Sequence, residues 1–316
     1  MKSRKRKNIP IVKAVSSYKP TIVDKSARAE PFRTRTIITE EEGKKVVYKC
    51  PASEMAKEFV KGIVAKEKAN AAYLKGHFDV HCGTLEKDCI QYDYLPYPSL
   101  PDKMQSHMHD RDFQAADELF YQYIQRIEAL ETTYTLPKEF LTLVADKDDY
   151  ASNVKCLSRG LFDLTPKNIL LHGNRWILLD NEWSFNFPIP MIFVVFRGIW
   201  ELVGTLQGEI RKITSEDIPA LGIFASALHT YYVPLIWIKY IIATDTSLRR
   251  LIKWEAGFRE YTFAARAYVG RIKRWPSLRR HFSARSIKSD NQVYIRMKKS
   301  IKSLPGVAKL EHILDE

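Results

Sequence analysis

The stretch Leu-Phe-Asp-Leu-Thr-Pro-Lys-Asn-Ile-Leu-Leu-His-Gly-Asn-Arg-Trp-Ile-Leu-Leu-Asp-Asn-Glu-Trp, residues 161–183, decides how the rest of the chain is interpreted. It contains two short apolar runs, Ile169–His172 and Trp176–Leu179, which the pattern predicts to be strands. Gly173 and Asn174 between them suit a two-residue turn, because both residues tolerate positive φ. The stretch therefore predicts a β-hairpin.

Three oxygen-bearing side chains gather at the open end of this hairpin. The predicted turn places Asn168 opposite Leu179, one position before Asp180, and Asp163 precedes them in a loop that Pro166 stiffens. Carboxylate and amide oxygens are ligands of the kind that Mg²⁺ prefers. Asp and Asn are also common turn residues, so an ordinary loop is the alternative. The apolar strands favour a site, because they would give it a rigid buried base.

The order Asp-x4-Asn, hairpin, Asp resembles a kinase catalytic loop and the metal-binding Asp that follows it. Residues 163–168 and 180–183 together resemble the kinase-like domains of bacterial surface-polysaccharide (O-antigen and lipopolysaccharide) biosynthesis. They are more distantly similar to aminoglycoside and choline phosphotransferases. The resemblance implies that Asp163 is the catalytic residue, that Asn168 and Asp180 hold Mg²⁺, and that ATP is the donor.

The sequence departs from protein kinases around this motif. Leu161 stands where protein kinases have a His, and Asn-Glu rather than Phe-Gly follows Asp180. No Ala-Pro-Glu segment is visible. These departures argue against a protein substrate rather than against phosphoryl transfer. Glu182 and Trp183 are expected to support the site or to contact the acceptor.

The fold class that the resemblance implies is α+β, with two lobes. A small antiparallel β lobe with one helix would bind ATP, and a larger, mainly helical lobe would carry the catalytic hairpin. The predicted boundaries are a basic, weakly structured leader over 1–30, the small lobe over 31–95 and the helical lobe over 96–316. A chain of 316 residues that is 45% hydrophobic can form cores of this size.

A strand lysine marks the predicted small lobe. Phe32–Thr39 and Val46–Lys49 have strand patterns, and a helix is predicted from Ser53 to about Leu74. In kinases, a strand lysine before such a helix reaches the ATP phosphates, and a glutamate of the helix holds it in place. An ordinary surface lysine on a hairpin edge is the alternative for Lys49.

The helix offers two glutamates for such an ion pair. Glu67 lies on its apolar stripe, where a charge is costly unless it is paired. Glu58 is the other candidate, and both remain open. The stripe itself follows steps of three and four residues through Val60, Ile63, Val64, Ala71 and Leu74.

Two further strands are predicted over Val80–Leu85 and Cys89–Leu95, the second ending at Pro96. In the resembling family, this second strand leads into the hinge between the lobes. Backbone groups there would face the adenine, and the residues concerned are Gln91, Tyr92, Asp93 and Tyr94. An ordinary edge strand that ends at a proline is the alternative.

A glycine-rich phosphate loop is absent from the sequence, since Gly43 is the only glycine before Gly62. Bound ATP would therefore depend on Lys49 and Mg²⁺ rather than on loop amides. This feature supports an alternative function, a catalytically inactive kinase-like scaffold that docks to an anionic membrane or to a partner through its basic ends.

The predicted helical lobe contains several amphipathic patterns. One helix is predicted around Phe113–Ile127, another over Ile192–Leu206, and helical patterns continue over 215–244 and 248–273. Arg197 could form a simple helix pair with Glu201 or brace the metal-binding loop, and both alternatives stay open. His107 and His109 lack further ligands at metal spacing and are interpreted as surface residues. The longest apolar stretch, Phe224–Thr244, is interpreted as a buried helix.

The net charge of +13 is concentrated at the two ends of the chain. A basic C-terminal region with interleaved aromatic residues suits contact with an anionic membrane surface, and it also suits an acidic partner or a polyanionic glycan. The expected acceptor is a saccharide or lipid-linked glycan, and a nucleic acid is not expected because no recognised module is present. Four cysteines without Cys-x-x-Cys spacing indicate a reducing compartment and no zinc site. The expected location is the cytoplasm, peripheral at the inner membrane face.

Overall fold

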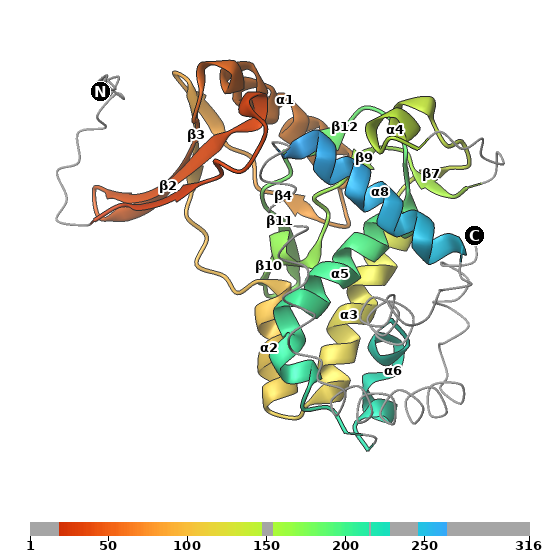
Figure 1. Ribbon diagram of the computed structural model, residues 1–316. Helices are drawn as coiled ribbons and strands as arrows, with labels where there is room; N and C mark the ends of the chain where they lie inside the picture. Colours follow the sequence, from red (N-terminus) through yellow and green to blue (C-terminus); the bar gives the residue numbers. More distant parts are fainter. Residues whose placement is uncertain (1–18, 147–153, 215, 228–245, 264–316) are drawn as a thin grey trace, which may run out of the picture. The chain divides into compact units, whose positions relative to one another are not determined.

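The computed structural model describes residues 19–146, 154–214, 216–227 and 246–263 (Figure 1). The chain forms two compact units, one made of Met1–Val64 and Cys82–Pro96, the other of Ala65–His81 and Tyr97–Glu316. The basic residues beyond 263 and the stretch 228–245 lie outside the described residues, as do the first 18 residues of the predicted leader.

The first unit contains a five-stranded sheet in the order β1-β2-β3-β6-β5, in which all neighbours are antiparallel (Figure 1). The prediction of a weakly structured leader over 1–30 is wrong for Thr21–Asp24. These residues form β1, and all four of them pair with β2. Glu42 and Gly43 make the β2–β3 turn, with φ values of 51° and 77°. The strands are β1 (Thr21–Asp24), β2 (Thr34–Glu41), β3 (Lys44–Pro51), β5 (Thr84–Glu86) and β6 (Cys89–Asp93).

Helix α1 (Lys57–Tyr73) provides the predicted helix of this region, preceded by the short helices η1 (Glu30–Phe32) and η2 (Glu54–Ala56). Val60 and Ile63 of α1 form the core of the first unit together with Ile90 of β6. The division between the two units falls within α1, so residues 65–73 belong to the second unit. The predicted boundaries had assigned the whole helix to the small lobe.

A disulfide joins Cys50 of β3 to Cys89 of β6. The β3–β6 register pairs Lys49 with Ile90, which places the two cysteines opposite each other on neighbouring strands. The sequence spacing had indicated a reducing compartment, and the disulfide removes the support for that interpretation. The pairing could not be predicted because it depends on the register of two strands that are 39 residues apart in sequence.

The second unit is mainly helical. Helices α2 (Leu100–His109), α3 (Phe113–Glu128) and α5 (Met191–Ile210) pack against one another, and α6 (Ile218–Ala227) packs on α3 (Figure 1). The remaining described helices are α4 (Lys138–Leu143) and α8 (Thr246–Thr262), which contact each other. The predicted helices around 113–127 and over 192–206 are confirmed as α3 and α5.

Short strands in the second unit surround the motif of residues 161–183. β10 (Ile169–His172) and β11 (Arg175–Leu178) form the hairpin, and β4 (Asp79–Val80) joins β11 in parallel. The prediction of one strand over Val80–Leu85 was wrong, because β4 and β5 belong to different units. The remaining strands are β7 (Thr132–Thr133), β8 (Cys156–Leu157), β9 (Gly160–Leu161), β12 (Ser184–Phe185) and β13 (Ile189–Pro190).

Helix α5 is long and apolar enough to cross a membrane by length and composition alone. Most of its residues are buried against the second unit, among them Phe193, Phe196 and Leu202. We therefore treat α5 as the central core helix of this unit. Together, the sheet of the first unit and the helices and hairpin of the second confirm the predicted α+β class.

Candidate active site

The hairpin predicted over residues 169–179 forms in the predicted register. Ile169 pairs with Leu178 and His172 with Arg175, so the turn consists of Gly173 and Asn174. Gly173 has a φ of 57°, a conformation that glycine adopts without steric cost. Beyond the strands, the Leu179 N–H donates to the Asn168 carbonyl at 2.7 Å. Asn168 therefore lies opposite Leu179, one residue before Asp180, as predicted.

The loop before the hairpin is held by bonds to its own backbone. The carbonyl of Asp163 accepts from the Thr165 N–H at 2.7 Å and from the Asn168 Nδ2 at 3.0 Å. The Asn168 N–H in turn donates to the Thr165 carbonyl at 3.0 Å. Because the Asn168 amide nitrogen is used inside the loop, its oxygen is the atom that would bind a cation.

Asp163 is tied directly to the segment that follows Asp180. The Trp183 N–H donates to the Asp163 Oδ2 at 2.8 Å, and the Phe162 N–H donates to the Trp183 carbonyl at 3.0 Å. Asp180 has a φ of 42°, which is uncommon for a residue other than glycine. Strained backbone of this kind persists where the surrounding structure fixes it, and it clusters at functional sites.

Two further carboxylates, those of Asp180 and Glu182, act on the Asp163 carboxyl. Burial, together with the negative charges of Asp180 and Glu182, raises the pKa of the Asp163 carboxyl to about 7, while the Trp183 N–H and Arg197 oppose the shift. Crowded carboxylates of this kind are relieved by a divalent cation. The described residues contain no group of three His, Cys, Asp or Glu side chains that would hold a metal alone. Magnesium commonly takes one or two carboxylates together with phosphate oxygens and water, so Asn168 and Asp180 fit a site that the nucleotide completes.

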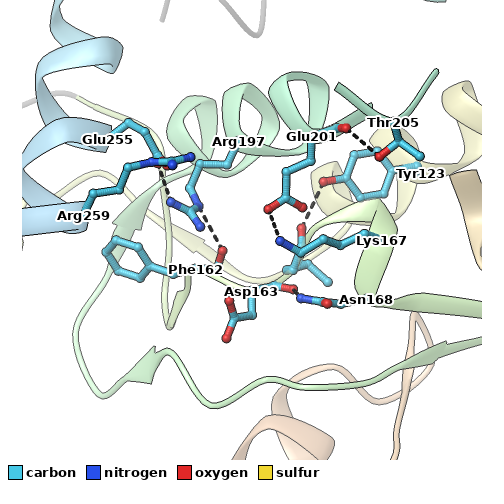
Figure 2. A network of polar contacts seen from close by, with 11 residues as sticks. Tyr123, Phe162, Asp163, Lys167, Asn168, Arg197, Glu201, Thr205, Glu255 and Arg259 are labelled. Carbon is cyan, nitrogen blue, oxygen red and sulfur yellow. Dashed lines mark hydrogen bonds and ion pairs between the residues drawn. The ribbon is translucent and has the colours of Figure 1, made fainter. Parts of the chain in front are cut away.

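Two side chains of α5, Arg197 and Glu201, contact the loop of residues 162–168 (Figure 2). Arg197 donates from Nε to the Phe162 carbonyl at 3.1 Å, and its Nη1 pairs with Glu255 of α8. Glu201 instead pairs with Lys167 of the loop. Arg197 and Glu201 therefore do not form the simple helix pair that was one alternative. Each contacts the loop separately, Arg197 at Phe162 and Glu201 at Lys167.

The predicted ATP-binding residues divide between the two units. Lys49 is 6% exposed in β3, and Glu67 is 1% exposed in the second half of α1. Glu58 lies on the outside of α1 and pairs with Lys61 at 3.3 Å. Burial thus favours Glu67 over Glu58 as the partner of a buried lysine. Because Lys49 and Glu67 belong to different units, their pairing stays a prediction.

The predicted adenine segment lies at the end of β6. Gln91 pairs with Tyr48 of β3 and with Thr84 of β5, so it is an inner residue of the sheet. Tyr92 and Asp93 pair with Val47 and Val46 of β3. The Tyr94 N–H donates to the Lys45 carbonyl at 3.3 Å, so an adenine contact by this segment would need one of its other backbone groups.

Sequence reasoning missed three polar residues next to the site. Lys66 and Asn70 lie on α1, and Arg159 lies just before β9. Burial lowers the pKa of the Lys66 amine, against the opposing effect of the Asp163 and Glu182 charges. The sequence did contain one sign of this cluster. Asn70 is a second polar residue on the apolar face of the helix, three positions after Glu67.

No protein-family model and no curated protein sequence matches the chain. Among solved structures, the chain is similar to a thermostable mutant of aminoglycoside phosphotransferase APH(4)-Ia, with 12% identity, a TM-score of 0.38 and coverage of 76% of this chain and 94% of that one. It is also similar to choline kinase LicA from Streptococcus pneumoniae, with 14% identity, a TM-score of 0.33 and coverage of 72% and 90%. A third is an ethanolamine kinase from Plasmodium vivax, with 10% identity, a TM-score of 0.29 and coverage of 78% and 84%. Similarity at this level assigns no activity to the chain.

Proposed function

We propose that this protein is an ATP- and Mg²⁺-dependent phosphotransferase that acts on a hydroxyl group of a small molecule or saccharide. One observation carries the proposal. The Asp163 carboxylate is fixed by the Trp183 N–H beside Asp180, while the hairpin brings Asn168 to the same point. A base close to two candidate metal ligands is the arrangement that phosphoryl transfer to a hydroxyl requires.

The proposed reaction uses Asp163 as the group that orients the acceptor. Its carboxylate accepts the proton of the hydroxyl while the acceptor oxygen forms a bond to the γ-phosphorus and the bond from that phosphorus to the ADP oxygen breaks. A pKa raised to about 7 suits a general base at neutral pH. Asn168 and Asp180 would hold Mg²⁺, which neutralises phosphate charge, and Lys49 would add a positive charge. Catalysis would consist of positioning and electrostatics.

The proposed acceptor and its biosynthetic role rest on the sequence resemblance alone. Residues 163–168 and 180–183 support a saccharide or lipid-linked glycan acceptor in cell-envelope polysaccharide biosynthesis. The net charge of +13 supports peripheral contact with an anionic membrane from the cytoplasmic side. Binding to nucleic acid is not part of the proposal.

A catalytically inactive scaffold is the second candidate. The observation that favours it is the lack of a glycine-rich phosphate loop, since the sequence before Gly62 contains a single glycine, Gly43 in the β2–β3 turn. Such a protein would keep the polar network around Asp163 as a structural feature and would act through its basic ends.

Thermal unfolding with and without Mg-ATP separates the two candidates. Ligand at about 100 times its dissociation constant adds roughly 2.7 kcal/mol to the free energy of unfolding. A Mg²⁺-dependent rise of about 5 °C or more is expected for the enzyme. No shift at millimolar Mg-ATP would favour the scaffold.

An Asp163→Ala variant tests the assignment of the base. We expect it to abolish phosphoryl transfer to saccharide acceptors, or basal ATP hydrolysis where no acceptor is found, and to leave nucleotide binding largely intact. Asp110→Ala, at the exposed end of α2, is the matched control and should behave like the wild type. Loss of nucleotide binding by a folded Asp163→Ala protein would contradict the proposed role.

A further inference from the structure

Asn70 of α1 connects the two chain segments that meet at the proposed active site. Its side chain is completely buried. Its Nδ2 donates to the Asn181 Oδ1 at 2.6 Å and to the Ser184 Oγ at 3.0 Å. Its Oδ1 accepts from the Arg159 Nε at 2.5 Å. One amide thus joins the chain just before the catalytic loop to the chain just after Asp180.

Lys66 contacts the same segment from one helical turn earlier. Its Nζ donates to the Glu182 carbonyl at 3.0 Å and lies 5.5 Å from the centre of the Phe185 ring. Residues four apart lie on the same face of a helix. The face of α1 that carries Lys66 and Asn70 therefore contacts residues 181, 182, 184 and 185.

The segment that α1 contacts needs outside support. Residues 179–182 belong to no helix or strand, and Asp180 within them has a φ of 42°. Trp183, the next residue, supplies the N–H that binds the Asp163 carboxylate. A shift of this short segment would move the proposed metal ligand and the donor to the proposed base together.

We propose that Asn70, assisted by Lys66, is a positioning residue of the phosphotransfer site, which fixes the Asp180–Trp183 backbone. This inference rests on the proposed function. Asn70 would touch neither substrate nor metal, and would act through Asn181 and Ser184. Outer partners that orient metal ligands typically change metal affinity or activity by about 10- to 100-fold when they are removed. Asn70→Ala should therefore raise the Mg²⁺ concentration needed for half-maximal stabilisation by ATP about tenfold or more.

The matched control is a variant that lowers the stability of the second unit at a position away from residues 179–185. Ile124 is a buried residue of α3 and takes no part in the contacts with residues 181–185 described above. Ile124→Val should lower the melting temperature and leave the Mg²⁺ dependence at the wild-type value. On α1, Lys66→Met should shift the Mg²⁺ dependence in the same direction as Asn70→Ala. Lys68→Met, on the exposed side of the helix, should not shift it.

A second measurement does not depend on nucleotide binding. Hydrogen exchange of peptides covering residues 179–185 should be about tenfold faster in Asn70→Ala than in the wild type, without any ligand. In Ile124→Val, exchange of these peptides should match the wild type under conditions where both proteins are folded. This readout reports the backbone of the segment directly.

The outcomes separate this inference from the proposed function. Faster exchange together with a weakened Mg²⁺ response supports the positioning role. Faster exchange with an unchanged Mg²⁺ response overturns it, because Asn70 would then be only structural, and unchanged exchange also overturns it. A wild-type chain without any Mg²⁺-dependent response to ATP overturns the proposed function, and this is seen before any variant is made.

Discussion

At the scale of single residues, the surroundings of Asp163 make its negative charge costly. Its carboxyl pKa is raised from 3.8 to about 7 by burial and by the charges of Asp180 and Glu182. A group whose pKa is higher in the folded than in the unfolded chain stabilises the fold most at low pH. That contribution is lost as the pH rises from about 4 to about 7.

Asp163→Asn keeps an oxygen to accept from the Trp183 N–H and removes the charge. We expect it to abolish activity and to raise the free energy of unfolding at pH 8 by about 2 kcal/mol.

The measurement is chemical denaturation in the presence of EDTA at pH 5 and at pH 8. The gain of Asp163→Asn over the wild type should be larger at pH 8 than at pH 5. Asp110→Asn, at an exposed position, should stay within about 0.5 kcal/mol of the wild type at both pH values. An Asn variant that is less stable than the wild type at pH 8 would contradict the interpretation of a costly charge.

At the scale of elements, α5 makes two ion pairs that we expect to contribute unequally to the free energy of unfolding. Arg197 and Glu255 are 9% and 11% exposed, whereas Lys167 and Glu201 are 55% and 18% exposed. Removing one member of a buried pair leaves an uncompensated charge and costs about 3 kcal/mol or more, although Arg259 also contacts Glu255 and softens the loss. Lys167 keeps its charge largely in solvent, and ion pairs that solvent screens contribute about 0–1 kcal/mol.

We expect Arg197→Met to destabilise the fold by about 3 kcal/mol and Glu201→Gln by less than 1 kcal/mol. Both variants remove a contact between α5 and the loop of residues 162–168, so each serves as the control of the other. Urea denaturation gives the two free energies. Equal losses would show that burial of the pair does not decide its contribution.

At the scale of the whole molecule, the chain consists of two units, and the disulfide lies in only one of them. Cys50 and Cys89 close a loop with a sequence separation of 39 residues. A cross-link over a loop of this length stabilises by about 2–4 kcal/mol through the unfolded state. We expect calorimetry to show that dithiothreitol, or Cys50→Ser with Cys89→Ser, lowers the unfolding temperature of the first unit. The exposed Cys82→Ser is the control and should have little effect. An unfolding profile that is insensitive to reductant would indicate two thiols at this position.

Local signals predicted the hairpin and the arrangement of its ends, whereas contacts between distant segments were beyond sequence reasoning. The Gly173-Asn174 turn fixed the register, so the place of Asn168 beside Asp180 followed from turn geometry. The role of Asn70 depends on residues about 111 positions away along the chain, and no spacing rule reaches that far. The split of the predicted strand at Val80 was missed for the same reason, because β4 finds its partner in β11.

The positive φ of Asp180 has a practical consequence for anyone who wishes to make an inactive version of this protein. Glycine adopts that backbone conformation freely, asparagine and aspartate tolerate it better than other residues do, and alanine there costs on the order of 1 kcal/mol. Asp180→Ala would therefore remove a carboxylate and disturb the main chain in one step. Asp180→Asn leaves the backbone undisturbed and removes only the charge. The asparagine substitution is the version whose loss of activity can be interpreted as chemistry, and the alanine version confounds chemistry with conformation.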